Sequence, residues 1–283
     1  MKKIGLVTLW KRNYGSALQC YATKSMVEKM GYHCIPLYRT FPGIQRYTYY
    51  LGEIVRFAID SFRYKGYISK YTSLRSAGKK SIGSLSKKSE ESIDRFVDDT
   101  LQPEGYSYSQ LKNIGKSEDF IAFIAGSDQI WNGSRRYDLV SFLGFVSDKK
   151  KIALAPSFGS EIEDYNKRSF SKEIRKFQLL SAREQEGVDN IAELTGRDAI
   201  RLSDPTSFLT PDEWRDFSKA ADDLEGEYIF IHFLDKPCDF ALQAMEKLRS
   251  DRGLPMVAFA YPQEEYERIK GIRFCNGGPR EYV

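Results

Sequence analysis

The stretch that decides the fold is residues 3–39, "KIGLVTLWKRNYGSALQCYATKSMVEKMGYHCIPLYR". It opens with a run of apolar residues typical of a buried strand, and residues 33–39 form a second such run. Between them, residues 16–31 place apolar side chains on one helical face and end at Gly31, where a helix C-cap is expected. Strand, helix and strand in this order predict a parallel sheet and an α/β fold.

The alternation of strand and helix patterns continues along the 283 residues, a length that favours two domains over one. We predict two Rossmann-like domains, residues 1–205 and the start of a second at 206–283, with an insertion at about 40–90. Further strands are expected at 119–125, 151–155, 179–184, 198–204, 227–234, 255–261 and 272–274. Helices are expected at 51–63, 90–100, 168–178, 186–196 and 239–251. "TPDEW" should start another, with Thr210 as N-cap.

Composition narrows the class of protein. No apolar run approaches the roughly 20 residues of a membrane span, and the apolar run at the N-terminus is too short for a secretory signal. The four cysteines have no metal-ligand spacing and are expected to be reduced, buried and structural; no metal site is expected. We therefore expect a cytoplasmic protein, with peripheral association with a membrane as the alternative.

The insertion is strongly basic, with eleven Lys and Arg between Arg39 and Lys88 against only Glu53 and Asp60. The ordinary interpretation is a solvated segment on a basic surface, with a flexible connection at 76–92. The alternatives are contact of residues 39–88 with an anionic membrane surface, an acidic glycan or nucleic acid. Nucleic acid is the least favoured, because no recognition motif is visible.

Polar clusters follow several predicted strands, and ligands of parallel sheets bind at the carboxyl ends of strands. The clusters are "KRNYGSALQ" (11–19), "GSDQIWN" (126–132), "APSFG" (155–159), "SARE" (181–184) and "SDPT" (203–206). In the first of them, Gly15 is expected to turn the backbone and Ser16 to cap the following helix. Each cluster alone is an ordinary turn, but several on one rim predict a binding site.

Other chemistries lack their motifs. The sequence contains no GxGxxG dinucleotide fingerprint, no GxxxxGK[ST] phosphate loop and no GxSxG nucleophile elbow. The two histidines do not complete a Ser-His pair: His33 precedes a strand and is expected to be exposed, and His232 is expected to pack in the core.

Taken in order, "TLWKRNYGSALQCYATKSMVEKMGYHCIPLYR", "FIAGSDQIWN", "KKIALAPSFGS", "SAREQEGVDNIAELTG" and "LSDPTSFLTPDEW" resemble the polysaccharide pyruvyl transferase family. The resemblance extends over the chain to about residue 282, apart from the basic insertion. It implies a GT-B-like fold and transfer of a pyruvyl group from phosphoenolpyruvate to a sugar hydroxyl pair, as a ketal, in cell-surface polysaccharide biosynthesis. The donor is a substrate, and no cofactor is implied. The partners implied are this donor and a glycan or lipid-linked glycan acceptor.

The resemblance also implies candidate substrate-binding residues. Arg183 is expected to act as an anion clamp, with a salt bridge to Glu184 as the alternative; Asp128 and Gln129 should organise hydroxyl groups or backbone, and Trp131 should offer an apolar platform to a sugar face. Asp128 is also the candidate catalytic residue. The full set is Asn13, Gly15, Gln19, Ser127, Asp128, Gln129, Trp131, Ser157, Arg183 and Glu184.

Two departures from the family pattern affect these expectations. Pro156 stands where a small residue is usual, and "FCNGGPREYV" (274–283) resembles the start of a family helix that precedes a Ser-Phe-His-Gly-type motif. The histidine of that motif is the natural general acid, and neither His33 nor His232 aligns with it. We therefore expect an incomplete second domain, leading to an inactive or purely glycan-binding protein, to a partner chain that completes it, or to self-association.

Overall fold

The computed structural model describes residues 1–69, 72–73, 85–147, 150–221, 224–233, 237–259 and 271–283. The chain divides into two compact units. The first comprises Met1–Trp10, Gly15–Leu74 and Val97–Leu209, and the second comprises Lys11–Tyr14, Arg75–Phe96 and Thr210–Val283. The two are described separately below.

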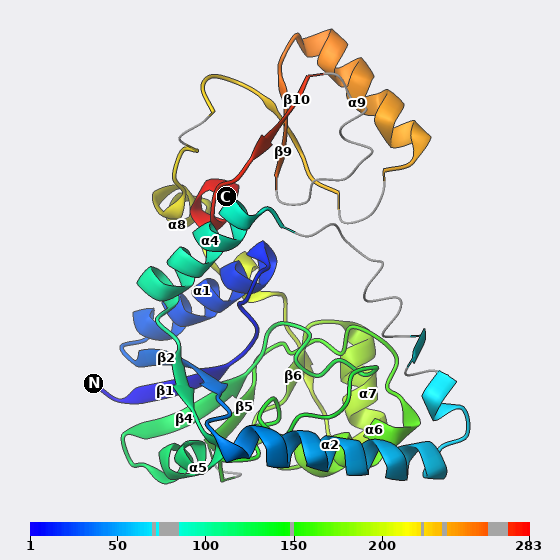
Figure 1. Cartoon of the computed structure of the whole chain (residues 1–283). Coiled ribbons are helices and arrows are strands. Elements are labelled where there is room, and N and C mark those ends of the chain that lie inside the picture. The colour runs from blue at the N-terminus through cyan, green and yellow to red at the C-terminus, as the bar shows by residue number, and fades with distance from the viewer. Residues whose placement is uncertain (70–71, 74–84, 148–149, 222–223, 234–236, 260–270) are drawn as a thin grey trace. The chain divides into compact units, whose positions relative to one another are not determined.

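A parallel sheet forms the centre of the first unit (Figure 1). Its strands are β1 (Lys3–Val7), β2 (His33–Arg39), β3 (Glu104–Tyr106), β4 (Phe120–Ala125) and β5 (Lys151–Ala153). Their order is β3-β2-β1-β4-β5, and every pair is parallel. The short strands β6 (Ser181–Ala182) and β7 (Ile200–Arg201) pair with each other, and a parallel bridge from Leu179 to Ile152 places this pair beside β5. The predicted parallel α/β sheet is confirmed.

The strand order fixes where ligands can bind. The chain moves from β1 outward to β2 and β3, and then returns across β1 to β4. Right-handed crossovers therefore place α1 (Tyr14–Lys29) and α5 (Tyr108–Lys116) on opposite faces of the sheet, as Figure 1 shows. The order reverses between β1 and β4, and the loops that leave the carboxyl ends of these two strands diverge there. In open α/β sheets this switch point is the usual ligand site.

An apolar core fills the face of the sheet that is covered by α5, α6 (Asp164–Ile174) and α7 (Gln185–Thr195). The segment between β4 and β5 contributes to this core: Trp131 is fully buried, stacks on Phe142 at 5.1 Å between ring centroids, and donates from Nε1 to the carbonyl of Ser141 at 3.0 Å. Trp131 therefore cannot offer a platform to a sugar. That prediction is wrong, because the aromatic side chains of this segment pack on one another.

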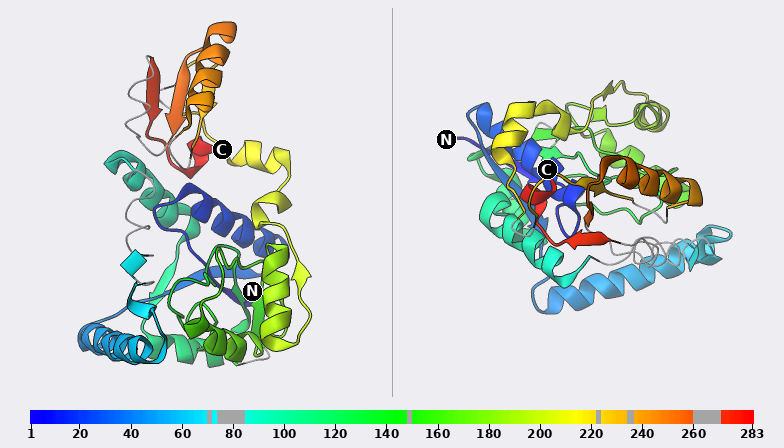
Figure 2. Two further views of the ribbon diagram at one scale, coloured as in Figure 1. Left: turned by 90° about the vertical axis from the view of Figure 1, so that its right-hand side faces the viewer. Right: turned by 90° about the horizontal axis from the view of Figure 1, so that it is seen from above.

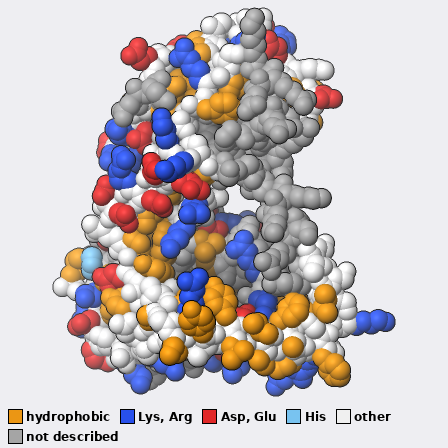
Figure 3. All heavy atoms as spheres, in the orientation of Figure 1, with side chains coloured by type: hydrophobic (Ala, Val, Ile, Leu, Met, Phe, Trp, Pro, Cys, Tyr) orange, Lys and Arg blue, Asp and Glu red, His pale blue; other side chains and the backbone are white. Residues whose placement is uncertain are grey.

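The insertion begins with a longer helix than predicted, α2 (Ile44–Arg63), which both views of Figure 2 place at the periphery of the first unit. Apolar side chains lie along its outer side, seen at the lower edge of Figure 3. The predicted flexible connection is wrong for residues 87–92, which belong to helix α4 (Lys87–Phe96). Its Ile93 and Phe96 are buried, so burial of an apolar face outweighs the polar composition. Residues 76–84 lie outside the described residues. Helix α4 is followed by a π-helical turn, Val97–Leu101.

The second unit has its own parallel sheet, β10-β9-β8, from strands β8 (Ile229–Ile231), β9 (Met256–Phe259) and β10 (Ile272–Cys275). A small core of Ile231, Met245, Met256 and Ala258 joins the sheet to α9 (Asp239–Arg252). Helix α8 (Pro211–Phe217) starts with the predicted capping box of Thr210 and Glu213. A last short helix, α11, covers Pro279–Tyr282.

The cysteines and histidines are placed mostly as predicted. All four cysteines are free, and Cys20, Cys34 and Cys275 are buried, but Cys238 is exposed at the start of α9, where no core reaches it. Burial raises the pKa of Cys34 to about 12, which keeps it a neutral thiol. His33 is exposed at the start of β2; His232 follows β8, half-buried, and burial lowers its pKa.

Candidate active site

The carboxyl ends of four neighbouring strands are joined into one rim by backbone hydrogen bonds. Gly126 N donates to the carbonyl of Val7 at 3.1 Å, which links the loops after β4 and β1. Ser157 N donates to the carbonyl of Asp128 at 3.1 Å, and Arg183 N donates to that of Pro156 at 3.3 Å. The loops after β1, β4, β5 and β6 therefore form one continuous wall at the switch point.

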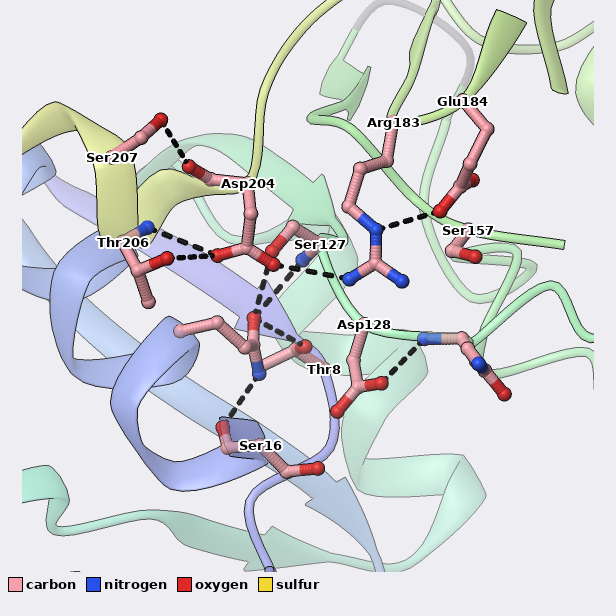
Figure 4. Close-up of polar contacts among 12 residues, drawn as sticks. Thr8, Ser16, Ser127, Asp128, Ser157, Arg183, Glu184, Asp204, Thr206 and Ser207 are labelled. Atoms are coloured by element: carbon pink, nitrogen blue, oxygen red, sulfur yellow. Dashed lines mark hydrogen bonds and ion pairs between the residues drawn. The ribbon is translucent and has the colours of Figure 1, made fainter. Parts of the chain in front are cut away.

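At the centre of this wall, the side chain of Gln19 ties the loop after β1 to the loop after β4 (Figure 4). Its Nε2 donates to the carbonyls of Leu9 and Ser16, both at 2.7 Å. Its Oε1 accepts from Thr8 Oγ1 at 3.2 Å and from the N–H and Oγ of Ser127 at 3.2 and 3.1 Å.

Thr8, Gln19 and Ser127 are almost completely inaccessible, with 6%, 2% and 0% of their surfaces exposed. The predicted direct contact of Gln19 and Ser127 with substrate is therefore wrong for their side chains. Their side-chain polar atoms hydrogen-bond to one another and to nearby backbone. Such bonds are needed because a buried polar group is costly unless it is hydrogen-bonded. We call Thr8, Gln19 and Ser127 the buried triad, and its role is to hold the rim.

Gly126 connects β4 to the buried triad and has a backbone conformation that only glycine adopts easily. Its φ is +128°, and a Cβ at this position would lie 2.0 Å from the carbonyl oxygen of Leu154.

Asp128 follows in the same loop. Its Oδ1 accepts from the N–H of Gln129 at 2.6 Å, and in Figure 4 its carboxylate points away from Arg183 and Ser157.

Arg183 lies between two carboxylates. Its Nε donates to Glu184 at 2.8 Å, and its Nη1 donates to Asp204 at 3.0 Å. Burial disfavours the charged form, but the hydrogen bonds and charges of Glu184 and Asp204 outweigh it and raise the pKa of the guanidinium. The salt bridge to Glu184, one of the two alternatives from the sequence, is therefore present. Asp204 is itself held by Thr206, whose N–H and Oγ1 donate to Oδ1 at 3.0 and 2.8 Å.

A cavity of about 340 Å³ opens beside this ion pair, entirely within the first unit. Its lining combines side-chain oxygens with a small apolar surface from Phe158. The lining residues are Gln129, Ser157, Phe158, Gly159, Ser160, Glu161, Glu184, Glu186 and Gly187. Three carboxylates and three neutral polar side chains are suited to hydroxyl groups, which donate to carboxylates and exchange hydrogen bonds with amides and hydroxyls.

The predicted residues thus fall into distinct places. Gln129, Ser157 and Glu184 line the cavity, and Arg183 forms a salt bridge with Glu184. Asp128 precedes Gln129 in the sequence but does not line the cavity. Asn13 belongs to the second unit.

Gly15 does not make the turn expected of it. Helix α1 begins at Tyr14, and the positive φ of 52° is at Arg12, so Gly15 and Ser16 already lie in the first helical turn. The prediction that Ser16 caps this helix is wrong for the same reason.

The residues predicted from the sequence to bind substrate do not include Thr8, Ser160, Glu161, Glu186 or Asp204, although Asp204 lies in one of the predicted polar clusters, 203–206. A signal existed for Asp204, because an aspartate before Pro-Thr at the end of a strand is an N-cap pattern, and Asp204 does cap the 3₁₀ helix Pro205–Phe208. Glu161 and Glu186 carry no such signal, since a surface glutamate has many ordinary uses. Within the described residues, no cluster of His, Cys, Asp and Glu could hold a metal ion.

A family model for polysaccharide pyruvyl transferase matches residues 13–271. The chain belongs to this family. The match spans both compact units, so the family assignment applies to the second parallel sheet as well as to the rim and the cavity. No curated protein matches the chain.

Proposed function

We propose that the chain transfers a pyruvyl group from phosphoenolpyruvate to two hydroxyls of a sugar, forming a cyclic ketal and releasing inorganic phosphate. Membership of the polysaccharide pyruvyl transferase family supports the reaction class. The observation that carries the assignment to a site is the oxygen-lined cavity formed by the segments that follow β4, β5 and β6, at the carboxyl ends of these parallel strands. A place in cell-surface polysaccharide biosynthesis follows from the same family and is part of the proposal.

The cavity is proposed to hold the sugar acceptor. Phosphoenolpyruvate carries both a phosphate and a carboxylate, and Glu161, Glu184 and Glu186 would repel these anions. A sugar, in contrast, presents several hydroxyl donors, and each attacking hydroxyl must be oriented toward the electrophilic carbon. The three glutamates can accept these hydrogen bonds, while Phe158 provides an apolar surface for the sugar ring.

Arg183 and Asp128 have separate roles in this proposal. Arg183 positions Glu184 through their salt bridge. It can bind the anionic donor only if the donor's carboxylate replaces Glu184 or Asp204 as a partner of the guanidinium. Asp128 accepts from the N–H of Gln129 and lies outside the cavity lining, so it organises the loop that carries Gln129, and a glutamate of the cavity is the candidate base for a sugar hydroxyl. Protonation of the enol methylene makes C2 electrophilic, the first hydroxyl adds there, phosphate leaves, and the second hydroxyl closes the ketal.

A GT-B-like pair of Rossmann-like domains is the architecture that we propose for this function. Each compact unit contains a parallel sheet connected through helices, which supports this architecture.

The reaction is tested by incubating the chain with phosphoenolpyruvate and a panel of sugars, and measuring phosphate release and the mass of the product. We expect sugar-dependent phosphate release and a sugar heavier by one pyruvyl group in ketal linkage. The variant Glu161→Gln/Glu186→Gln should raise the KM for the sugar about tenfold or more, with a smaller change in the KM for the donor. Glu118→Gln is the matched control, because Glu118 is exposed and precedes β4 at the opposite edge of the sheet.

Two outcomes would count against the proposal. Equal effects of the cavity variant and the Glu118→Gln control on the KM for the sugar would contradict the proposal that the acceptor binds in the cavity. Saturable binding of sugars without any phosphate release would instead assign a non-catalytic glycan-binding role, which is the alternative that the sequence leaves open.

A further inference from the structure

Helix α2 is oriented opposite to an ordinary surface helix: both of its carboxylates face the protein, and most of its large apolar side chains face solvent. Amphipathic surface helices normally bury the apolar stripe against the core. No residue of α2 is buried, although the helix has 20 residues and a pronounced apolar side.

Polar and aromatic contacts hold the inner side of α2. Arg136 donates to Glu53 Oε2 at 2.9 Å and to Asp60 Oδ2 at 3.1 Å, and these two carboxylates lie two turns apart on the same side of the helix. Arg56 donates to the carbonyl of Tyr137 at 3.3 Å and lies over its ring. The orientation of the helix is therefore fixed by an ion-pair network that is partly shielded from solvent, with Arg136 only 14% exposed.

The outer side of α2 carries six large apolar side chains, each at least half exposed, which we call the α2 apolar face: Ile44, Leu51, Ile54, Val55, Ile59 and Phe62. Phe62 is 98% exposed. The spacing of seven, four and seven residues from Ile44 through Leu51 and Val55 to Phe62 aligns these four in one stripe. Figure 3 shows apolar side chains gathered at this edge of the molecule. A contiguous exposed apolar patch of this kind marks an interaction surface.

The charges beside the α2 apolar face have one sign. Residues 41–69 contain two carboxylates, Glu53 and Asp60, and both are turned inward onto Arg136. The exposed charged side chains of this segment are Arg46, Arg63 and Lys65. Helical spacing puts Arg63 beside the apolar stripe and Arg46 on the side of Glu53 and Asp60, so the surface combines the stripe with the cations Arg63 and Lys65 near its C-terminal end. Tyr47 and Tyr50 add exposed aromatic rings with polar tips.

We propose that the α2 apolar face docks this protein onto an anionic lipid surface, with the helix lying in the plane of the interface. Its apolar side chains would enter the boundary between headgroups and acyl chains, while Arg63 and Lys65 meet lipid phosphates. Tyrosines are suited to the same boundary, because one end of the side chain is apolar and the other is polar.

A second copy of the chain fits this surface less well. Two α2 helices packed face to face about a twofold axis would bring the cations Arg63 and Lys65 of each copy to the border of the contact. No exposed carboxylate of residues 41–69 is present to oppose these like charges. An anionic lipid surface supplies the missing negative charge without requiring a complementary groove.

The helix lies on the surface of a membrane in this proposal and does not cross it. Among the helices of the described residues, none combines the length and the hydropathy that a membrane span requires. Vesicle binding is measured without donor or acceptor, so the proposal stands or falls independently of the reaction proposed above.

The test is sedimentation of the full chain with vesicles of phosphatidylcholine alone and of phosphatidylcholine mixed with phosphatidylglycerol. We expect binding to the mixed vesicles that weakens as salt is raised. Ile54→Gln/Ile59→Gln should reduce the partition coefficient about tenfold or more, since two partly inserted side chains become polar. The matched control is Leu179→Gln/Ile200→Gln, which changes apolar side chains that are 59% and 66% exposed, against 65% and 55% for Ile54 and Ile59.

A third variant separates charge from apolar contact. Arg63→Gln/Lys65→Gln should reduce the preference for phosphatidylglycerol several-fold while leaving the fold intact, because both side chains are exposed. Absence of binding by the unaltered chain, or equal loss in the Leu179→Gln/Ile200→Gln control, would overturn the proposal. Self-association that Ile54→Gln/Ile59→Gln abolishes, without vesicle binding, would overturn it in favour of a second copy.

Discussion

The buried triad and the α2 apolar face reverse the usual distribution of side chains in opposite ways. At the switch point of the first sheet, Gln19 and Ser127 place polar groups where at most 2% of the residue is exposed. On α2, Phe62 and its neighbours place large apolar groups in solvent. The first arrangement costs little because every polar atom of Gln19 has a partner, whereas the second has no compensation within the described residues of the chain.

The two regions differ in what their side chains can do: the buried triad can hold a site in a fixed position, whereas the α2 apolar face can bind a partner. Buried, fully paired polar groups fix the backbone of a rim on which a ligand can be oriented. Exposed apolar groups instead add nothing to folding and become favourable only when something covers them. Hydrophobicity alone therefore identifies neither region; the informative feature in each case is a side chain in the environment that does not suit it.

The largest expected change in stability comes from Gly126, whose backbone N–H links the loop after β4 to the end of β1. Gly126→Ala should lower the free energy of unfolding by about 3–5 kcal/mol, because the new Cβ meets the Leu154 carbonyl and φ is strained. Denaturant unfolding measures the change. Gly196→Ala is the control: φ is +67° there, but nothing lies within 4 Å of the added Cβ, so a loss of about 1 kcal/mol is expected. Equal losses of stability in Gly126→Ala and Gly196→Ala would mean that the backbone around Gly126 shifts easily to make room for the added Cβ.

Replacing the amide at the centre of the triad should have the next largest effect. Gln19→Leu keeps the size of the side chain but leaves Thr8 and Ser127 without their shared acceptor, at a cost of about 2–4 kcal/mol. A double-mutant cycle with Ser127→Ala should return a coupling of about 1 kcal/mol. Strictly additive losses would indicate that the two side chains do not act together.

The inner side of α2 should respond more weakly. Arg136→Ala leaves Glu53 and Asp60 without their cation and should cost about 1–3 kcal/mol, with faster amide hydrogen exchange concentrated in α2. Arg215→Ala removes a fully solvated pair with Asp212 and should change stability by no more than about 0.5 kcal/mol. If exchange in α2 is the same in both variants, the ion-pair network does not hold the helix.

The smallest effect should come from the outer side of α2. Ile54→Gln/Ile59→Gln should change the free energy of unfolding by less than about 0.5 kcal/mol, because neither side chain packs in the core. Ile174→Ala, at a position with no exposed surface in α6, should cost about 2–5 kcal/mol in the same assay. A large loss from the α2 variant would show that its apolar face already supports the fold.

The sequence predicted the elements of the first sheet well because their signals are local. The alternation of strand and helix in residues 3–39 reproduces β1, α1 and β2 to within a few residues, and the capping box at Thr210 starts α8 as expected. The helix expected at 90–100 is present as α4 and the π-helical turn that follows it, but its start at Lys87 was assigned to the flexible connection, since Ser and Lys dominate its first turns.

The site was predicted less completely than the fold. The rim position of Gln129, Ser157 and Glu184 follows from the ends of strands, and they do line one cavity. The burial of Trp131 and Gln19 depends on contacts with residues far along the chain, such as Phe142, Phe158 and Ser127, which no local pattern contains. The inverted orientation of α2 was equally hidden, because it depends on Arg136, 76 residues beyond its partner Asp60.

The position of Arg183 between two acids has a consequence for redesign. Asp204 is not part of the cavity lining, yet it neutralises the guanidinium that also holds Glu184. Changing this remote acid to asparagine would leave the guanidinium with Glu184 as its one carboxylate partner among the described residues, and would make the electrostatic potential at that side of the cavity more positive. The charge of the cavity can thus be edited at a position outside its lining.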